Sequence, residues 1–399
     1  MRRLFGLFGA GIGGAFAGVL LMISAQGSPS HPRATSSPTS TIPAKVAPLP
    51  EPTADVLLAW TPTTLDPRLA PAAHDLPEVE VVSEVSAGLT NLVASHDSDG
   101  AQVDRTDPGW AIPLDTIAID PDDQARLASV ADRDAVASLG PGQALLGRTS
   151  AGLRRLDVGA TIDMEHGQTV VVAGVVEDAT IGAAELAVDK ATGLSLGVDN
   201  PRYLLLAHGG DRAEVETALR RAIPAEAAIR FRGLGETPYL RHGDAVLPQV
   251  RIKERFGEFA YKPPPTGERD FVQDPVWQSA NLVTRDMPIL GQMRCHRAVA
   301  DAIEGALAEV EAANLAAMLD PAGFVGCWNP RLVVADGDVS HHAWGVALDV
   351  NYDANPTGQE SIQDPRLVEI FDSWGLTWGG EWLVRDPAHF EFVRPPQPH

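Results

Sequence analysis

Two short stretches near the C-terminus contain side chains of the types that bind and use a catalytic metal. The first runs from Ser340 to Asp349 and places His342 seven residues before the carboxylate of Asp349. The second supplies another imidazole, His389, with the carboxylate of Asp386 three residues before it. Two histidines, one carboxylate and one spare acid are what a hydrolytic zinc site requires. The spacing therefore predicts a zinc centre in the last third of the chain.

The carboxylate ligand is expected on a short strand, residues 345–351. Val346, Leu348 and Val350 would face the core, so Gly345, Ala347 and Asp349 face the other way. That second face has almost no side-chain bulk before the carboxylate, which would admit a metal or a substrate close to the sheet. His342 lies just before this strand and is expected to fold back toward Asp349.

The second histidine is expected at the start of a strand around residues 390–393. Phenylalanines alternate toward the core there, so His389 and Glu391 share the opposite face. A proline lies between Asp386 and His389, which places Asp386 in the loop that enters the strand rather than on a helix. From that loop Asp386 can lean over a metal held by His389.

Hydrolysis by a metal-bound water defines roles for the neighbouring residues. Three protein ligands leave a fourth position for a water, whose pKa falls to about 7. Asp386, which need not be a ligand, would take a proton from that water and later protonate the departing amine. A cation must stabilise the oxyanion, and Arg331, just upstream of the first ligand, is the best-placed candidate. Without the other residues, Arg331 would be interpreted as a surface arginine.

These residues also carry a family resemblance. Residues 340–349 fit the pattern SxHxxGxAxD at every fixed position, and residues 378–391 resemble the WGG…DPxHFE end of VanY-like carboxypeptidases. Residues 326–331 are similar to the GC-x-x-PR segment of the same subgroup. In this order, the motifs resemble those of the M15 zinc peptidases, the D-alanyl-D-alanine carboxypeptidase family. The resemblance covers residues 256–394 and leaves out the middle of the chain.

The resemblance implies a C-terminal α+β domain of the hedgehog and D-alanyl-D-alanine carboxypeptidase type, a small antiparallel sheet with helices. It implies one zinc ion, a general base and acid at Asp386, and an oxyanion or substrate-positioning cation at Arg331. The implied zinc ligands are His342, Asp349 and His389.

Three further residues are expected to contact substrate or to support the ligands: Ser340, Glu391 and Trp378. Ser340 corresponds to the serine of the first motif. The adjacent His341 is an extra histidine that the motif does not require. It is a competing ligand candidate, although in an extended segment it would point away from His342.

The chain has two cysteines, Cys295 and Cys327. In an exported protein an even number favours a disulfide. Closing a loop of that length would stabilise the fold by about 3–4 kcal/mol in the chain-entropy treatment. Metal binding is the alternative, but two cysteines so far apart, with His296 beside one of them, make a poor zinc pattern.

The N-terminus is typical of a targeting segment. Arg2 and Arg3 precede an uncharged run, residues 4–25, that suits either a signal peptide or one membrane-spanning helix. Residues 1–27 are therefore expected to be a signal peptide or an anchor, and residues 28–56 a linker rich in Pro, Ser and Thr. Either outcome predicts an extracytoplasmic protein, secreted or anchored to the cell membrane and facing the cell wall.

The length of 399 residues suggests two domains. Residues 57–250 are expected to form an α/β or α+β domain of unknown role, with a binding or spacer function as the default, and residues 251–399 the peptidase domain. The elements predicted on either side are strands at 78–81, 169–176, 203–206 and 228–231 and helices at 211–223, 295–313 and from Asp364 to Gly375.

Charge and motifs together define the expected function. The net charge of −22 repels nucleic-acid phosphates, so a nucleic-acid partner is not expected. The expected activity is zinc-dependent hydrolysis of peptidoglycan stem peptides, first as a D-alanyl-D-alanine carboxypeptidase. An L-alanyl-D-glutamate endopeptidase and a non-catalytic, zinc-stabilised module that binds the cell wall or a partner remain alternatives. A third possibility is a partner-recruiting role for the middle domain, with the peptidase as its effector.

Overall fold

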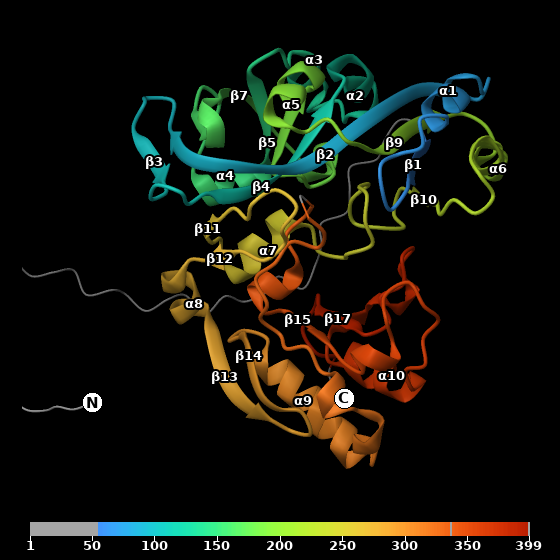
Figure 1. The fold of residues 1–399 in the computed structure, drawn as a ribbon. Helices are drawn as coiled ribbons and strands as arrows, with labels where there is room; N and C mark the ends of the chain where they lie inside the picture. Colours follow the sequence, from blue (N-terminus) through green and yellow to red (C-terminus); the bar gives the residue numbers. More distant parts are fainter. Residues whose placement is uncertain (1–54, 336, 398–399) are drawn as a thin grey trace, which may run out of the picture. The chain divides into compact units, whose positions relative to one another are not determined.

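A large mixed sheet dominates the first part of the chain (Figure 1). The computed structural model describes residues 55–335 and 337–397. The strand order is β10-β1-β9-β2-β4-β8-β5-β7-β6, and β3 pairs with β2 outside this path. The strands are β1 (Asp55–Trp60), β2 (Val79–His96), β3 (Gln102–Arg105), β4 (Ile112–Ile119), β5 (Gln143–Gly147), β6 (Thr161–Met164), β7 (Thr169–Val176), β8 (Leu186–Asp189), β9 (Pro201–His208) and β10 (Arg230–Gly233).

The long strand β2 connects the two halves of this sheet. Its first half pairs antiparallel with β9, and its later residues pair with β4, β6 and β3. The sheet is mixed because β4 pairs with β8, and β5 with β7, in parallel. Apolar residues of the helices pack on it in separate buried clusters. These helices are α1 (Leu69–His74), α2 (Pro121–Leu127), α3 (Arg133–Ala137), α4 (Arg148–Arg154), α5 (Lys190–Leu196) and α6 (Arg212–Ala222).

Local sequence signals located several of these elements. The predicted strand at 169–176 is β7, although its residues alternate between buried and partly exposed instead of being buried throughout. The predicted helix at 211–223 is α6, and its cap Asp211 accepts a hydrogen bond from the backbone N–H of Ala213 at 2.8 Å. Two boundaries were wrong. The strand expected at 228–231 is β10, two residues later, and β1 begins at Asp55, inside the predicted linker.

The C-terminal part is built from short elements around a three-stranded antiparallel sheet of order β15-β17-β16. Its helices are α7 (Gln249–Phe256), α8 (Pro275–Asn281), α9 (Ala300–Ala312) and α10 (Pro365–Ser373). Its strands are β11 (Tyr261–Lys262), β12 (Val272–Gln273), β13 (Leu282–Met287), β14 (Gly291–His296), β15 (Ala347–Asp349), β16 (Leu376–Trp378) and β17 (His389–Phe392). The chain is thus a mixed α+β protein, as expected.

The helix predicted from Cys295 begins at Ala300 instead. Cys295 and His296 belong to β14, where they pair with Val283 and Leu282 of β13. A periodic apolar pattern does not reveal this tertiary pairing. The predicted disulfide is present, between Cys295 and Cys327.

Helix α10 follows its sequence signals closely. The Asp364 carboxylate caps it by accepting the backbone N–H of Arg366 at 2.9 Å, and a proline occupies the first turn. Leu367 and Phe371 are buried. Gly375 follows the helix with φ 85°, and a Cβ there would meet the backbone of Arg394, so only glycine suits this position.

The strand predicted at 345–351 is shorter than expected. β15 contains only Ala347–Asp349, and all three residues are buried. Gly345 lies outside it, with φ 68°, where it closes a 3₁₀ turn, η5 (His341–Trp344). The bare, open face expected beside Asp349 is therefore covered by protein.

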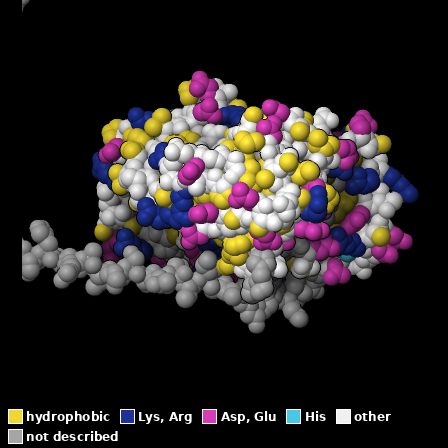
Figure 2. Space-filling view, turned by 90° about the horizontal axis from the view of Figure 1, so that it is seen from below, with side chains coloured by type: hydrophobic (Ala, Val, Ile, Leu, Met, Phe, Trp, Pro, Cys, Tyr) yellow, Lys and Arg dark blue, Asp and Glu magenta, His cyan; other side chains and the backbone are white. Residues whose placement is uncertain are grey.

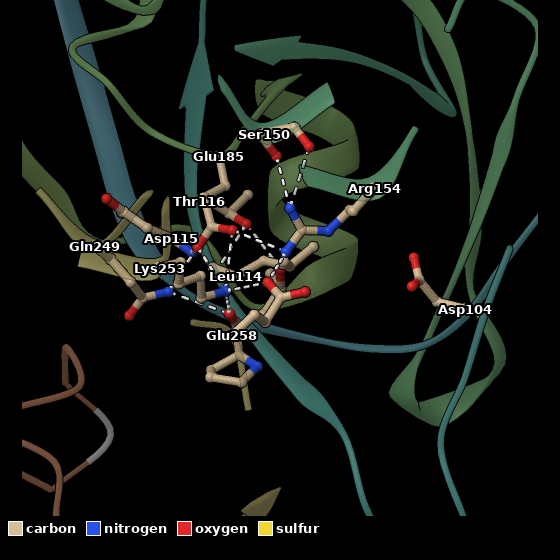
Figure 3. Close-up of polar contacts among 12 residues, drawn as sticks. Asp104, Leu114, Asp115, Thr116, Ser150, Arg154, Glu185, Gln249, Lys253 and Glu258 are labelled. Atoms are coloured by element: carbon tan, nitrogen blue, oxygen red, sulfur yellow. Dashed lines mark hydrogen bonds and ion pairs between the residues drawn. The ribbon is translucent and has the colours of Figure 1, made fainter. Parts of the chain in front are cut away.

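A buried ionic cluster joins the sheet to α7 (Figure 3). Glu185, just before β8, pairs with Arg154 of α4 and with Lys253 of α7, each at 2.9 Å. These three side chains are fully buried. Glu258 contacts both cations, and although burial disfavours its charged form, Arg154 and Lys253 hold its pKa below the usual range. The predicted domain boundary at 250 falls inside α7, and the described residues belong to one compact unit.

Two predictions concern residues outside the described part of the chain: the targeting segment at 1–27 and most of the linker. Within residues 55–335 and 337–397, no helix has the length and apolar character needed to cross a membrane. On the face shown in Figure 2, acidic and basic side chains are interspersed with hydrophobic ones. The acidic excess of the chain is therefore not displayed on that face as a uniform negative field.

Candidate metal centre

The three predicted ligands converge on one buried point. Ligand atoms of His342, Asp349 and His389 all lie within 4.8 Å of one another. The antiparallel pairing of β15 with β17 places Asp349 directly opposite His389. Directly opposed residues of an antiparallel pair have neighbouring side chains, so the strand register itself creates half of the site.

The third predicted ligand, His342, comes from the turn η5. Ser340 caps this turn, and its hydroxyl accepts the backbone N–H of His342 at 3.4 Å. The Nδ1 atom of His342 lies 3.2 Å from the carbonyl oxygens of both Gly326 and Cys327. Because a carbonyl oxygen only accepts, Nδ1 carries the proton. The lone pair on Nε2 then faces Asp349 Oδ1, 3.2 Å away, where a metal would bind.

His389 has carboxylates on both sides of its ring. Nδ1 lies 3.0 Å from Asp349 Oδ1, and Nε2 lies 3.5 Å from Glu391 Oε2. Glu391 Oε2 also accepts a hydrogen bond from His341 Nδ1 at 2.6 Å. The extra histidine therefore contacts Glu391 and lies outside the group of three. Glu391 is placed to orient the ring of His389, a supporting role that ligand histidines commonly receive from a carboxylate.

Positive charge is favoured between the two carboxylates of the site, Asp349 and Glu391. Burial opposes the charged form of His389, but hydrogen bonds to Asp349 and Glu391 outweigh it and raise its pKa to about 10. Burial likewise opposes ionisation of both carboxyls, and the neighbouring histidines nevertheless keep the pKa of each well below its usual range. A divalent cation would supply this positive charge in place of the proton.

The donor set fits such a cation. Two imidazole nitrogens and one carboxylate oxygen are ligands that suit zinc and similar divalent ions, and three protein ligands leave a position open. All three side chains are nearly inaccessible to solvent, with side-chain exposures of 0 % for His342, 5 % for Asp349 and 9 % for His389. The arrangement can therefore hold a metal in a largely dehydrated site.

Arg331 lies beside the ligand group. Its Nη2 atom is 3.8 Å from Asp349 Oδ2, and its side chain is 20 % exposed. The backbone carbonyl of Arg331 accepts the N–H of Ser340 at 3.0 Å, which ties this residue to the cap of η5. A partly exposed guanidinium next to a ligand carboxylate is placed to meet a substrate oxygen.

The structure places Asp386 in the loop between η7 (Gly379–Glu381) and β17, as predicted. Its backbone N–H donates to Gly379 at 2.9 Å, and its carbonyl accepts the N–H of His389 at 3.0 Å. Its carboxylate accepts a hydrogen bond from the Thr357 hydroxyl at 3.1 Å. A Cβ on Gly379 would lie 2.7 Å from the Asp386 carbonyl, so this close approach requires glycine.

Two tryptophans support the same loop. The indole N–H of Trp378 donates to the Pro387 carbonyl at 2.8 Å. This hydrogen bond fixes the backbone of the loop that leads into β17. The Trp382 ring lies with its centroid 5.1 Å from that of His389. Sequence reasoning did not identify Trp382 or Thr357 as site residues. The two tryptophans in residues 378–382 were the sequence signal that could have indicated Trp382. No sequence signal indicated Thr357.

Comparison with known families agrees with this site. Residues 334–392 match an M15 peptidase family described as D-alanyl-D-alanine carboxypeptidase. All three ligands and Asp386 lie inside the matched range, and Arg331 lies just before it. The match supports an M15-family peptidase domain in the C-terminal region of the chain.

Other comparisons add little. No curated protein matches the chain in sequence. The periplasmic region of MacB from Actinobacillus actinomycetemcomitans aligns over 44 % of this chain and 87 % of its own, with 12 % identity and a TM-score of 0.32. The extracellular domain of the noncanonic ABC-type transporter YknZ from Gram-positive bacteria aligns over 44 % and 99 %, with 12 % identity and a TM-score of 0.30. At such TM-scores neither likeness bears on fold or function.

Proposed function

We propose that this chain is an exported, zinc-dependent peptidase that hydrolyses peptidoglycan stem peptides, in the manner of the VanY-like carboxypeptidases. The preferred bond in this proposal is the terminal D-alanyl-D-alanine bond. The observation that carries it is the convergence of His342, Asp349 and His389 within 4.8 Å, inside the segment that matches the peptidase family.

The residues around the ligands supply what amide hydrolysis needs. Bound zinc would lower the pKa of a water and polarise the scissile carbonyl. Asp386 then accepts the proton of the attacking water and delivers it to the departing amine. Arg331 stabilises negative charge on the substrate, either the oxyanion or the terminal carboxylate of the peptide. Its partial exposure beside Asp349 supports this role.

Export is supported by the disulfide and by the uncharged run at residues 4–25, which follows Arg2 and Arg3. Bonds such as Cys295–Cys327 persist in oxidising compartments and are rare in the cytosol. In this proposal the N-terminal segment directs the protein across the membrane or anchors it there. The substrate is then the cell-wall peptide, and no nucleic acid is a partner.

Mass spectrometry of purified stem peptides tests the proposal. The zinc-loaded protein should remove one terminal alanine from a pentapeptide stem, and an Asp386→Ala variant with the same zinc content should not. A cut between L-alanine and D-glutamate would show that the protein is an endopeptidase and not a carboxypeptidase. Unchanged peptides in the presence of bound zinc would contradict catalysis and leave a zinc-stabilised binding module.

A further inference from the structure

The loop that carries Asp386 is held by a residue from outside the C-terminal sheet. Asp244 lies between β10 and α7, and its side chain is 5 % exposed. Its Oδ2 atom accepts the backbone N–H of Leu383 at 2.5 Å. Its Oδ1 atom pairs with both Arg230 and Arg232 of β10. A single buried carboxylate thus connects the edge of the large sheet to the loop between η7 and β17.

Two further contacts hold the same loop. Arg230, while paired with Asp244, donates from Nη2 to the carbonyl oxygen of Glu381 at 3.0 Å. The side chain of Leu383 packs against a buried cluster of the sheet that contains Tyr203 and Leu205. The loop is therefore fixed to the sheet by its backbone on both sides of Trp382 and by one apolar side chain.

The segment that contains Asp244 also reaches the metal ligands. The backbone N–H of Val246 donates to Glu391 Oε1 at 3.2 Å. The other oxygen of Glu391 contacts His341 and, at 3.5 Å, Nε2 of His389. Only one residue therefore stands between this segment and a ligand.

Both ends of the segment are anchored. Its N-terminal end follows β10, which pairs antiparallel with β1. Its C-terminal end leads directly into α7, whose Lys253 belongs to the buried ionic cluster with Glu185 (Figure 3). The connection, residues 234–248, is also held along its length by the contacts of Asp244 and Val246, so it can act as a rigid support for the groups it touches.

We propose that Asp244 is a positioning residue for the candidate active site. By holding Leu383 and Arg230, it fixes residues 379–386 so that Trp382 lies against His389 and Asp386 stays at the entrance to β17. This inference rests on the proposed function for its catalytic consequence. The mechanical part of the inference, that Asp244 holds the loop of residues 379–386 in place, does not depend on which reaction the site performs.

Hydrogen exchange measured by mass spectrometry tests the mechanical part on the full-length protein. In Asp244→Ala the amides of residues 379–386 should exchange about tenfold faster, because the N–H of Leu383 loses its acceptor and two arginines lose their shared partner. Exchange in α9 should stay unchanged. Arg230→Met provides a second variant that cuts the contact with Glu381 while Asp244 keeps Arg232.

Asp132→Ala is the matched control. Asp132 is similarly buried, at 6 % exposed, and accepts the N–H of Glu177 and the hydroxyl of Thr180, at 3.1 Å and 2.6 Å. Its loss should destabilise the fold without changing exchange in residues 379–386. With stem peptides, Asp244→Ala should lower kcat about tenfold at full zinc content, whereas Asp132→Ala should not, since small displacements of catalytic groups are costly.

The outcomes separate the two proposals. Unchanged exchange of the loop in both Asp244→Ala and Arg230→Met would overturn the positioning role, whatever the activity. A wild-type protein without peptidase activity would overturn the proposed function, and the exchange data would still decide the role of Asp244. Faster exchange of the loop with an unchanged kcat would restrict Asp244 to structure and contradict its positioning of the catalytic groups.

Discussion

The two adjacent histidines at 341 and 342 have different environments, and this difference determines what each one does. His342 Nε2 points at Asp349, whereas His341 Nδ1 points at Glu391. His342→Ala should therefore lose its bound zinc, because two remaining ligands make a weak site. His341→Ala is the matched control and should keep about one zinc per chain, with affinity weakened by tenfold at most. Metal analysis after dialysis measures both, and zinc retained by His342→Ala would contradict the ligand assignment.

His296 predicts a pH dependence of stability. Burial lowers its pKa from 6.5 to about 4, and its Nε2 atom donates to the carbonyl of Phe256 at 3.1 Å. Because the folded pKa lies below the unfolded one, the stabilisation is complete above pH 6.5 and is lost as the pH falls toward 4. The loss is at most about 3 kcal/mol.

Urea unfolding at pH 7.5 and 4.5 measures this effect. His296→Gln removes the titrating group and keeps an N–H donor, so its free energy of unfolding should fall less than that of the wild type over the same interval. Carboxylates elsewhere contribute equally to both proteins and cancel in the difference. An identical fall in the two proteins would rule out His296 as the source.

Among the elements, the turn η5 depends on one glycine. Gly345 has φ 68°, and a Cβ there would lie 2.9 Å from the backbone nitrogen of His296. Gly345→Ala should destabilise the fold by about 2–3 kcal/mol, from backbone strain and the contact together, and should weaken metal binding because His342 belongs to the same turn.

Gly291→Ala is the matched control for this prediction. Gly291 also has a positive φ, 74°, but a Cβ there would meet no atom within 4 Å. Its cost should be about 1 kcal/mol, from strain alone, with zinc affinity unchanged. Chemical unfolding and zinc titration measure the two effects, and equal costs for the two variants would show that the contact with His296 is unimportant.

The sequence specified elements whose signals are local. The Asp364 cap with its proline gave α10, and alternation of Phe390 and Phe392 gave β17 and the direction of His389. The start of α9 and the length of β15 were wrong because tertiary contacts set them. Cys295 pairs across a hairpin, and Gly345 turns against His296. The sequence brought together the three residues of the candidate metal group because residue type and spacing limit such a group more strongly than they limit secondary structure.

At the scale of the whole molecule, the sequence predicted two domains but could not predict their contacts. The buried cluster around Glu185 and the contacts of Asp244 join residues that lie far apart in the chain. Charged residues at such positions look like ordinary surface residues in the sequence, because their partners are brought near only by folding. The middle region therefore appeared to have no role in the site, whereas the structure places it against the loop that precedes β17.

Lys253→Met tests how strongly the buried ionic cluster couples the large sheet to the C-terminal part of the chain. Lys253 is fully buried and pairs with Glu185 and Glu258, each at 2.9 Å. Its loss leaves Arg154 as the cation that Glu185 and Glu258 must share, so the cluster keeps one uncompensated negative charge, which costs about 3–5 kcal/mol. Because the cluster connects the sheet to α7, the wild type should unfold in one transition, and the variant should lose the cooperativity between the sheet and the C-terminal part.

Urea unfolding followed by hydrogen exchange in β9 and in α9 distinguishes these cases. Coincident midpoints are expected for the wild type and separated midpoints for Lys253→Met. Arg366→Ala is the control. Its ion pair with Asp364 lies at the surface, where solvent screens it, so this change should leave the midpoints coincident. A small loss and coincident midpoints in Lys253→Met would mean that apolar contacts, rather than the ionic cluster, couple the sheet to the peptidase region.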